Sequence, residues 1–216
     1  MQRGLFITFE GSEGCGKSTQ IQRLAARFQA RGIPFLLTRE PGGTPIGEEI
    51  RHLLQFNKIG HAMKSEAELL LFTASRAQLA REVILPALES GTTVIADRFL
   101  DSTTVYQGVA REIDPASVKF INDFAVGACV PDITFVLDLD PKKARERMLG
   151  RKGAAEGDDR MEQQAPEFYE AVRDGYLRLA AAEPQRVRLI DASHSVAEIE
   201  EEIRARLNEK TGGFLI

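Results

Sequence analysis

The 216-residue chain has no tryptophan, only two cysteines and only three histidines. Two cysteines cannot build the disulfide framework of many small secreted domains, so we expect Cys15 and Cys129 to be reduced. No group of cysteines and histidines has the spacing of a zinc site. These absences exclude a disulfide scaffold and a zinc domain, and they predict a cytoplasmic protein.

The chain also lacks an excess of positive charge and a long hydrophobic run. It has 28 Lys and Arg against 32 Asp and Glu, a net charge of −4, so no global basic field would attract nucleic acid. No apolar run approaches the roughly 20 residues of a membrane span. The first apolar run starts almost at the N-terminus, and we therefore expect no signal peptide. We expect neither a nucleic acid nor a membrane as a partner.

Residues 11 to 18 read G-S-E-G-C-G-K-S and fit the phosphate-loop pattern G-x-x-x-x-G-K-[ST] without a mismatch. An apolar run precedes this P-loop and a segment with helical spacing follows it, which is the context the motif requires. Glycines allow backbone N–H groups to surround phosphate oxygens at a helix N-terminus. We expect Lys17 to reach the β- and γ-phosphates of ATP and the Ser18 hydroxyl to bind Mg²⁺. The residues assigned to ATP binding in this stretch are Gly11, Ser12, Glu13, Gly14, Cys15, Gly16, Lys17, Ser18 and Thr19.

The rest of the chain alternates between short apolar runs and helical segments, which predicts a five-stranded parallel sheet with helices on both faces. The length suits one core, so we expect a single α/β domain over residues 1–216 with the three-layer fold of P-loop NTPases. Residues 151–164 are charged and lack periodicity, as expected of a short lid. The expected strands are 5–9, 33–37, 92–96, 133–137 and 187–190, and the expected helices are 19–31, 44–56, 65–89, 115–124, 141–149, 168–182 and 196–208.

A P-loop alone does not name a reaction, because GTPases, motor ATPases and small-molecule kinases share it. Three further segments narrow the choice: T-R-E-P-G-G-T at 38–44, L-F-T-A-S-R at 71–76 and D-R-F-L-D-S-T-T-V-Y-Q-G at 97–108. With the P-loop, these segments resemble the signature set of the thymidylate kinase family over essentially the whole chain. The resemblance implies a nucleoside monophosphate kinase that transfers the γ-phosphoryl group of ATP to dTMP, with Mg²⁺, on the route to dTTP. It also implies a homodimer.

The resemblance implies a separate cationic clamp for the acceptor phosphate. Arg98 follows the third strand, Arg51 lies on the helix after the T-R-E-P segment, and Arg39 is a third candidate. Arginine suits such a site because its planar fork matches phosphate oxygens in pairs. Glu13 corresponds to a family carboxylate near the acceptor. Glu10 and Glu40 are weaker candidates and are expected as structural partners of nearby arginines.

The resemblance also implies a thymine site. Phe72 corresponds to the residue that stacks on the base, and Arg76, one helical turn later, would donate to thymine O4. Thr103 and Gln107 correspond to residues that bond the ring N3–H and carbonyl edge, although many relatives carry serine or asparagine at the position of Thr103. Tyr106 corresponds to the residue that packs beneath the sugar and disfavours a 2′-hydroxyl.

Phosphoryl transfer requires a metal ion and charge neutralisation more than covalent chemistry. Asp97 and Asp138 each follow an apolar strand, and either carboxylate could orient Mg²⁺ together with Ser18. We favour Asp97 because it belongs to the matched segment. The acceptor phosphate is already ionised at neutral pH, so no general base is required.

The lid is expected to supply one catalytic cation. Some family members carry a basic residue in the P-loop where this chain has the uncharged Gly14 and Cys15. We therefore expect Arg151 to act as an arginine finger, with Arg160 as the second choice. Arg147 corresponds to a residue that stacks on adenine. The residues expected to act in catalysis are Lys17, Glu13, Arg98, Arg151 and Arg160.

Three other functions remain as alternatives. Another nucleoside or nucleotide kinase would share the P-loop, but the three arginines of the clamp favour a monophosphate acceptor. A non-catalytic nucleotide-binding regulator would be expected to have lost Lys17, Ser18 or Asp97, and all three are present. A nucleic-acid-dependent ATPase would need a basic face, which the net charge of −4 disfavours.

Overall fold

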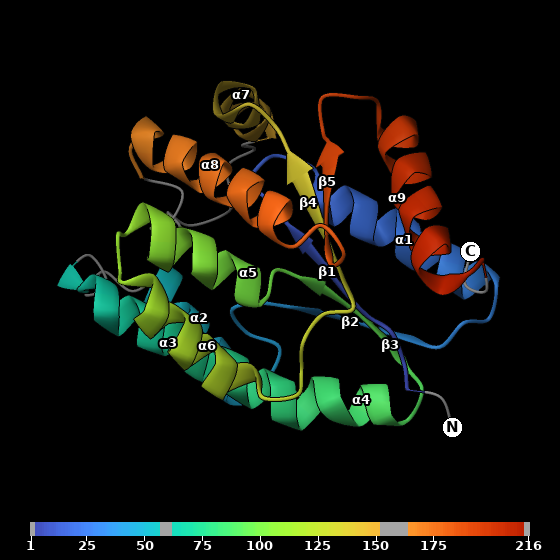
Figure 1. Cartoon of the computed structure of the whole chain (residues 1–216), viewed down its shortest axis with the longest axis horizontal. Helices are drawn as coiled ribbons and strands as arrows, with labels where there is room; N and C mark the ends of the chain where they lie inside the picture. Colours follow the sequence, from blue (N-terminus) through green and yellow to red (C-terminus); the bar gives the residue numbers. More distant parts are fainter. Residues whose placement is uncertain (1–2, 57–61, 152–163, 214–216) are drawn as a thin grey trace.

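The computed structural model describes residues 3–56, 62–151 and 164–213 of the chain. Five parallel strands form one sheet in the order β2-β3-β1-β4-β5, which confirms the predicted sheet (Figure 1). Strand β1 lies in the centre, and each of its residues is buried because helices cover both faces. The strands are β1 (Phe6–Glu10), β2 (Phe35–Arg39), β3 (Thr93–Asp97), β4 (Ile133–Asp138) and β5 (Val187–Asp191).

The register of the strands brings their carboxyl ends to one edge of the sheet. Phe9 of β1 lies opposite both Asp97 of β3 and Phe135 of β4. Asp138 of β4 lies opposite Asp191 of β5. Parallel sheets bind their ligands at this edge, so the P-loop after β1 and the segment after β3 meet where a ligand is expected.

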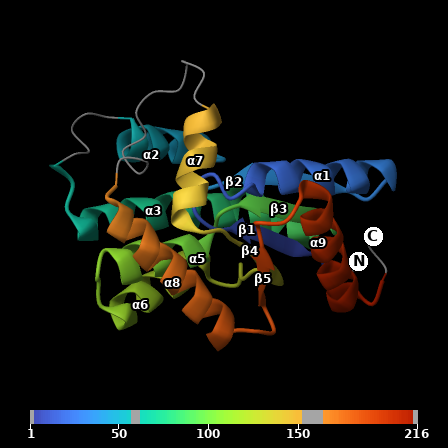
Figure 2. The same cartoon turned by 90° about the horizontal axis from the view of Figure 1, so that it is seen from above.

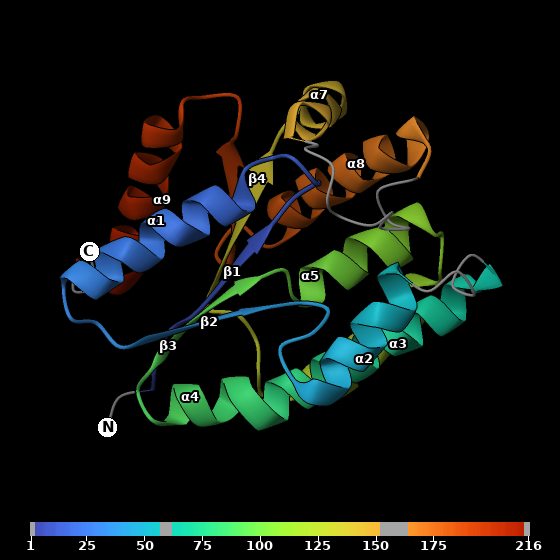
Figure 3. The ribbon, with the colours of Figure 1, turned by 180° about the vertical axis from the view of Figure 1, so that it is seen from behind.

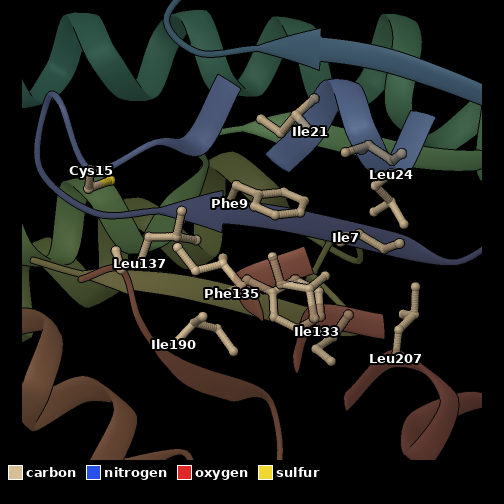
Figure 4. Packing of buried hydrophobic residues seen from close by; sticks show 14 of the residues in the cluster. Ile7, Phe9, Cys15, Ile21, Leu24, Ile133, Phe135, Leu137, Ile190 and Leu207 are labelled. Carbon is tan, nitrogen blue, oxygen red and sulfur yellow. The ribbon is translucent and has the colours of Figure 1, made fainter. Parts of the chain in front are cut away.

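The side chains of β1 alternate between two hydrophobic layers, as the pleat of a strand requires. Ile7 and Phe9 face Ile21 and Leu24 of helix α1 (Figure 4). Phe6 faces the opposite layer, which contains the end of α3 and helix α4. The core therefore fixes the strand that leads into the P-loop from both sides.

Helices form a layer on each face of the sheet. Helices α1 and α9 pack on one face, whereas α3 and α4 pack on the other, and α8 packs with the segment after β3 on β4 and β5 (Figures 2 and 3). Helix α7 rises from the end of β4 at the carboxyl edge (Figure 1). The helices are α1 (Lys17–Ala30), α2 (Pro45–Gln55), α3 (Ser65–Leu79), the π-helical η2 (Ala80–Ile84), α4 (Leu85–Glu89), α5 (Leu100–Thr103), the π-helical η3 (Thr104–Ala110), α6 (Pro115–Val126), α7 (Pro141–Arg151), α8 (Pro166–Ala182) and α9 (Val196–Thr211).

Two helical segments differ from the prediction. The expected helix 65–89 contains a π-helical turn, η2, between α3 and α4. Residues 100–110, to which the apolar pattern assigned no element, form α5 and η3. Their buried residues include Asp101, Thr103 and Gln107, so polar side chains interrupt the apolar periodicity that would indicate a helix. π-helical turns occur frequently at functional sites.

Candidate active site

The P-loop connects β1 to α1 and needs glycine at specific positions. Gly16 caps α1 with a left-handed φ of 103°. A Cβ atom on Gly14 would lie 2.4 Å from the backbone oxygen of Ala144 in α7, so only glycine allows this approach. Lys17 begins α1, is 6% exposed, and donates from Nζ to the backbone oxygens of Gly11 and Ser12 at 3.1 Å each. The loop thus holds the lysine ammonium at its own centre.

Ser18 and Asp97 place a hydroxyl and a carboxylate next to each other beside the P-loop. The Ser18 hydroxyl donates to Asp97 Oδ2 at 3.3 Å. Asp138, the alternative carboxylate, is engaged elsewhere, because both of its oxygens accept hydrogen bonds from Arg173 of α8 at 2.7 and 2.8 Å. Within the described ranges, no group of three or more His, Cys, Asp or Glu side chains could hold a metal ion. A hydroxyl and one carboxylate fit Mg²⁺, which is commonly completed by substrate phosphates and water.

Arg98 stands between the P-loop and the segment after β3. Its backbone has a left-handed φ of 71°, a conformation that costs a non-glycine residue energy and is found mainly at functional sites. Its guanidinium donates to Glu13 Oε1 at 2.6 Å and to Ser102 Oγ at 3.2 Å. Burial opposes ionisation of Glu13, but Lys17 and Arg98 outweigh it and hold the pKa of that carboxyl at about 2. Glu13 is therefore ionised at neutral pH.

Glu10 fixes the segment that carries Arg98. Its fully buried carboxylate accepts from the backbone N–H groups of Phe99 and Ser102 at 2.9 and 3.1 Å. It also accepts from the hydroxyls of Ser102 at 2.6 Å and Tyr176 at 2.7 Å. One Arg98 nitrogen lies 3.8 Å away, which confirms Glu10 as a structural partner of an arginine. Burial raises the pKa of the Glu10 carboxyl above its usual range, against the opposing effect of Arg98.

The T-R-E-P segment contacts Arg51, whereas Arg39 is held at the surface by an ion pair. Thr44 caps α2 through its hydroxyl, which accepts from the Gly47 N–H at 3.0 Å, and Arg51 on this helix donates to the backbone oxygen of Pro41 at 3.1 Å. Arg51 is also among the cations that lower the pKa of Glu13. Arg39 instead forms an exposed two-point pair with Glu48, at 3.1 and 2.9 Å. The structure therefore brings Arg51, but not Arg39, towards Arg98.

Arg76 is the centre of a buried polar network and is 1% exposed. It donates to Glu40 Oε2 from Nε at 2.9 Å and from Nη2 at 2.6 Å, which confirms Glu40 as an arginine partner. It also donates to Thr103 Oγ1 and Asn122 Oδ1 at 2.8 Å each, and to the Phe99 backbone oxygen at 3.0 Å. These bonds use all five guanidinium N–H groups. A base oxygen that accepts from Arg76 must therefore share or replace one of these bonds.

The side chains of the segment after β3 lie beside the polar network of Arg76. Thr103, Tyr106 and Gln107 are buried on α5 and η3, at 1, 7 and 2% exposure. Gln107 donates from Nε2 to Glu68 Oε1 on α3 at 2.8 Å. The Tyr106 hydroxyl is buried and has no hydrogen-bond partner among the residues that the structure describes. Buried hydroxyls are usually bonded, so this group indicates a position where a ligand would supply the partner.

Comparison with known proteins identifies the family. The family model described as "Thymidylate kinase" matches residues 9–203. Thymidylate kinases from Halothermothrix orenii and Chlorobium luteolum are 49% and 48% identical; the matches cover 99% of both chains in the first case, and 95% of this chain and 98% of the relative in the second. The chain belongs to the thymidylate kinase family. The crystal structure of thymidylate kinase from Ehrlichia chaffeensis matches with a TM-score of 0.74 and 33% identity, covering 95% of this chain and 99% of that one. The reaction of the thymidylate kinase family is phosphorylation of dTMP by ATP, and this is the reaction of the enzyme described here.

The lid residues expected from the thymidylate kinase resemblance lie mostly outside the described part of the chain. Arg160 falls in residues 152–163, and the structure describes the backbone of Arg151 but not its side chain. Arg147 on α7 donates to the Ala192 backbone oxygen at 3.2 Å, at the carboxyl edge of the sheet. A cavity of ≈ 310 Å³ separates α7, the start of α8 and the P-loop, and Glu13 lines it.

Sequence reasoning missed several residues that bond the candidate site residues of this thymidylate kinase. Asn122, Tyr176 and Glu68 each bond a predicted residue or its support, yet all three lie outside the family segments in the sequence, Glu68 only three residues before one of them. No local motif marks them. Only an isolated polar residue within an apolar helical pattern could have indicated them.

In the described parts of the chain, no helix is long and apolar enough to cross a membrane.

Proposed function

We propose that the donor and acceptor sites of this kinase meet at the P-loop, with ATP held by residues 11–19 and the dTMP phosphate held by Arg98 and Arg51. One observation carries this proposal: Arg98 forms a 2.6 Å bond to Glu13, a residue of the P-loop itself. An acceptor phosphate bound by Arg98 would thus lie beside the γ-phosphate of ATP. Positioning of this kind supplies a large part of phosphoryl-transfer catalysis.

Charge neutralisation is proposed as the main chemical contribution of the site. Lys17 would stabilise the transferring phosphoryl group, and Ser18 with Asp97 would hold Mg²⁺. The metal, when bound, would offset charge on the β- and γ-phosphates. Glu13, with its pKa held at about 2, would keep the arginines oriented and would not accept a proton from the acceptor. The dTMP phosphate is itself ionised at neutral pH and needs no base.

The base would lie between Phe72 on α3 and the polar side chains of α5 and η3. In this proposal Phe72 stacks on thymine, while Thr103 and Gln107 bond its N3–H and carbonyl edge. Arg76 orders the pocket by joining α3, α5 and α6, and would exchange one of its bonds for thymine O4. Tyr106 would pack against the deoxyribose, which the unpartnered state of its buried hydroxyl supports.

Arg151 is proposed as the lid cation that stabilises the transferring group, with Arg160 as the second candidate, and Arg147 as the residue that stacks on adenine. The support for Arg151 is its position at the end of α7, the helix that approaches the P-loop at Gly14. Two buried thiols, Cys15 and Cys129, support the proposed cytoplasmic location.

A homodimer is proposed through the outer faces of α3 and α6. Phe120 and Phe124 lie one turn apart on α6 and are 74% and 76% exposed, and Leu70 of the adjoining α3 is 55% exposed. Large apolar side chains gathered on one exposed face are typical of an interface. A second copy of the chain would cover them by a symmetric contact.

The acceptor clamp can be tested by comparing Arg51 on α2 with Arg39 at the end of β2. We expect Arg51→Ala to raise the KM for dTMP about 10-fold or more and to leave the KM for ATP within about twofold, because a charge-assisted bond is lost. Arg39→Ala is the matched control and should change the KM for dTMP by less than about threefold, since Arg39 pairs with Glu48 at the surface. Steady-state ADP release measures both, with thymidine as an acceptor that should be inert. Equal effects of the two variants, or turnover of thymidine, would contradict the clamp.

A further inference from the structure

Glu68 lies on α3 one helical turn before Phe72, and its side chain is buried. Its Oε1 accepts from Gln107 Nε2 at 2.8 Å and from Arg111 Nε at 3.3 Å, and its Oε2 accepts from Arg111 Nη2 at 3.4 Å. Arg111 is itself held by Gln164, whose Oε1 accepts at 2.9 Å. A buried carboxylate with a guanidinium beside it is the paired state expected of an ionised group.

A carboxylate next to an amide decides which way the amide faces. An ionised carboxylate only accepts hydrogen bonds, whereas the Gln107 amide carries donors on one side and an acceptor on the other. Rotating the amide by half a turn would place two acceptor oxygens against each other at 2.8 Å. The Gln107 N–H₂ group must therefore face Glu68, and its Oε1 must face away from Glu68.

The Oε1 atom of Gln107 is the part of the amide that remains available. Gln107 is 2% exposed, and among the described residues none donates a hydrogen bond to its Oε1. Residues four apart on a helix are neighbours, so an amide held against Glu68 lies about one turn from the ring of Phe72. The site therefore offers an acceptor, and not a donor, next to the stacking side chain.

We propose that Glu68 is a positioning residue for base specificity, which fixes the Gln107 amide so that the site selects pyrimidines with a protonated N3. This inference rests on the proposed contact between Gln107 and the base. Thymine and uracil carry an N3–H that donates to an oxygen, whereas cytosine presents an unprotonated N3 that would repel it. Discrimination by a buried, unpaired polar group is strong compared with discrimination by shape alone.

The test uses Glu68→Gln in the full-length enzyme. The new carboxamide can donate or accept, so it no longer forces the Gln107 amide into one orientation. We expect the Kd of dTMP to rise about 10-fold and the Kd of dCMP to fall or stay constant. The ratio of the Kd of dCMP to the Kd of dTMP should therefore decrease about 10-fold or more. The dUMP/dTMP ratio should not change, because both bases carry N3–H. Isothermal titration calorimetry measures these constants without requiring turnover.

The matched control is Glu82→Gln. Glu82 accepts from Gln78 at 2.6 Å in an exposed Gln–Glu pair that continues from the same helix. This variant should bind all three nucleotides as the wild type does. Glu68→Asp keeps a carboxylate that only accepts hydrogen bonds. It should retain the wild-type ratio of the Kd of dCMP to the Kd of dTMP even if both affinities change. Circular dichroism confirms that each variant is folded.

A fourth variant distinguishes the base contact of Gln107 from the positioning role of Glu68. Gln107→Met removes the amide, and an unchanged dCMP/dTMP ratio in it would contradict the proposed base contact itself. A changed ratio in Gln107→Met with an unchanged ratio in Glu68→Gln would overturn the role of Glu68 and leave that contact standing. Equal losses of dTMP and dCMP affinity in Glu68→Gln would also overturn it, because a purely structural role would weaken both.

Discussion

Arg76→Ala is expected to lower the free energy of unfolding of this enzyme, whatever its effect on substrate binding. The substitution leaves the Glu40 carboxylate without a cation at 3% side-chain exposure, and the second oxygen of that carboxylate, Oε1, has no hydrogen-bond partner among the described residues even with Arg76 present. Removing one member of a buried ion pair costs about 3–5 kcal/mol. Thr103 and Asn122 also lose donors, which adds to the cost but not in full, because the groups share one network.

A loss of this size is a large part of the about 5–15 kcal/mol that stabilises an ordinary domain. For a chain of this length, each kcal/mol lowers the midpoint of thermal unfolding by about 2–4 °C, so Arg76→Ala should lower it by about 6–20 °C. Far-UV circular dichroism is the suitable probe, because the chain has no tryptophan for fluorescence. Arg204→Ala removes an exposed ion pair with Glu201, and its midpoint of thermal unfolding should be close to that of the wild type.

Glu40→Gln combined with Arg76→Met tests the cause. With both charges gone, we expect the double variant to recover part of the stability lost in Arg76→Ala, since a buried pair replaced on both sides is often neutral. A midpoint for Arg76→Ala within about 2 °C of the wild type, equivalent to less than about 1 kcal/mol, would refute the reasoning. Reduced dTMP binding by Arg76→Ala therefore indicates a base contact only at temperatures where the variant is folded.

Two further predictions concern the acid limb of activity and the oligomeric state. Glu13 has its pKa lowered to about 2, so it adds stability that is present above its usual value of 4.5 and is lost as the pH falls towards 2. The decrease of kcat/KM on acidification should therefore lie near pH ~6, where a phosphate monoester gains its second proton. The same decrease should be seen in Glu13→Gln. A pH–rate profile of this variant in which the decrease is shifted or absent would contradict this. Phe124→Glu should give a monomer in sedimentation velocity while Val196→Glu, at an exposed apolar position on α9, keeps the wild-type state; identical sedimentation of both would remove α6 from the proposed interface.

The central strands of the sheet could be predicted from the sequence because they are buried on both faces. Ile133–Asp138 and Phe6–Glu10 are apolar runs, each with a single threonine, that end in a carboxylate, as expected of strands covered on both faces. The segment 100–110 could not be predicted in the same way. Its buried side mixes Asp101, Thr103 and Gln107 with Val105 and Tyr106, and a helix whose buried side is partly polar gives only a weak hydrophobic signal.

The candidate site follows the same division. Asp97 ends β3, while Lys17 and Ser18 begin α1 after the P-loop, and all three belong to local patterns, so their proximity follows from the register of the sheet and the length of the loop. Glu68 and Asn122 act on residues 39 and 46 positions away along the chain. Such pairs depend on how helices pack, and no spacing within a single segment encodes them.

Helix α8 shows why the acceptor site cannot be understood from its motifs alone. This helix follows the expected lid, and it bonds Glu10 through Tyr176 and Asp138 through Arg173. Its first turn places Phe168 against Arg111, whose guanidinium carbon lies 4.7 Å from the ring. Glu10 supports the segment of Arg98, while Arg111 supports Glu68 and hence Gln107. A shift of α8 would therefore act on the proposed phosphate clamp and on the proposed base site together, because both depend on hydrogen bonds to groups that α8 holds.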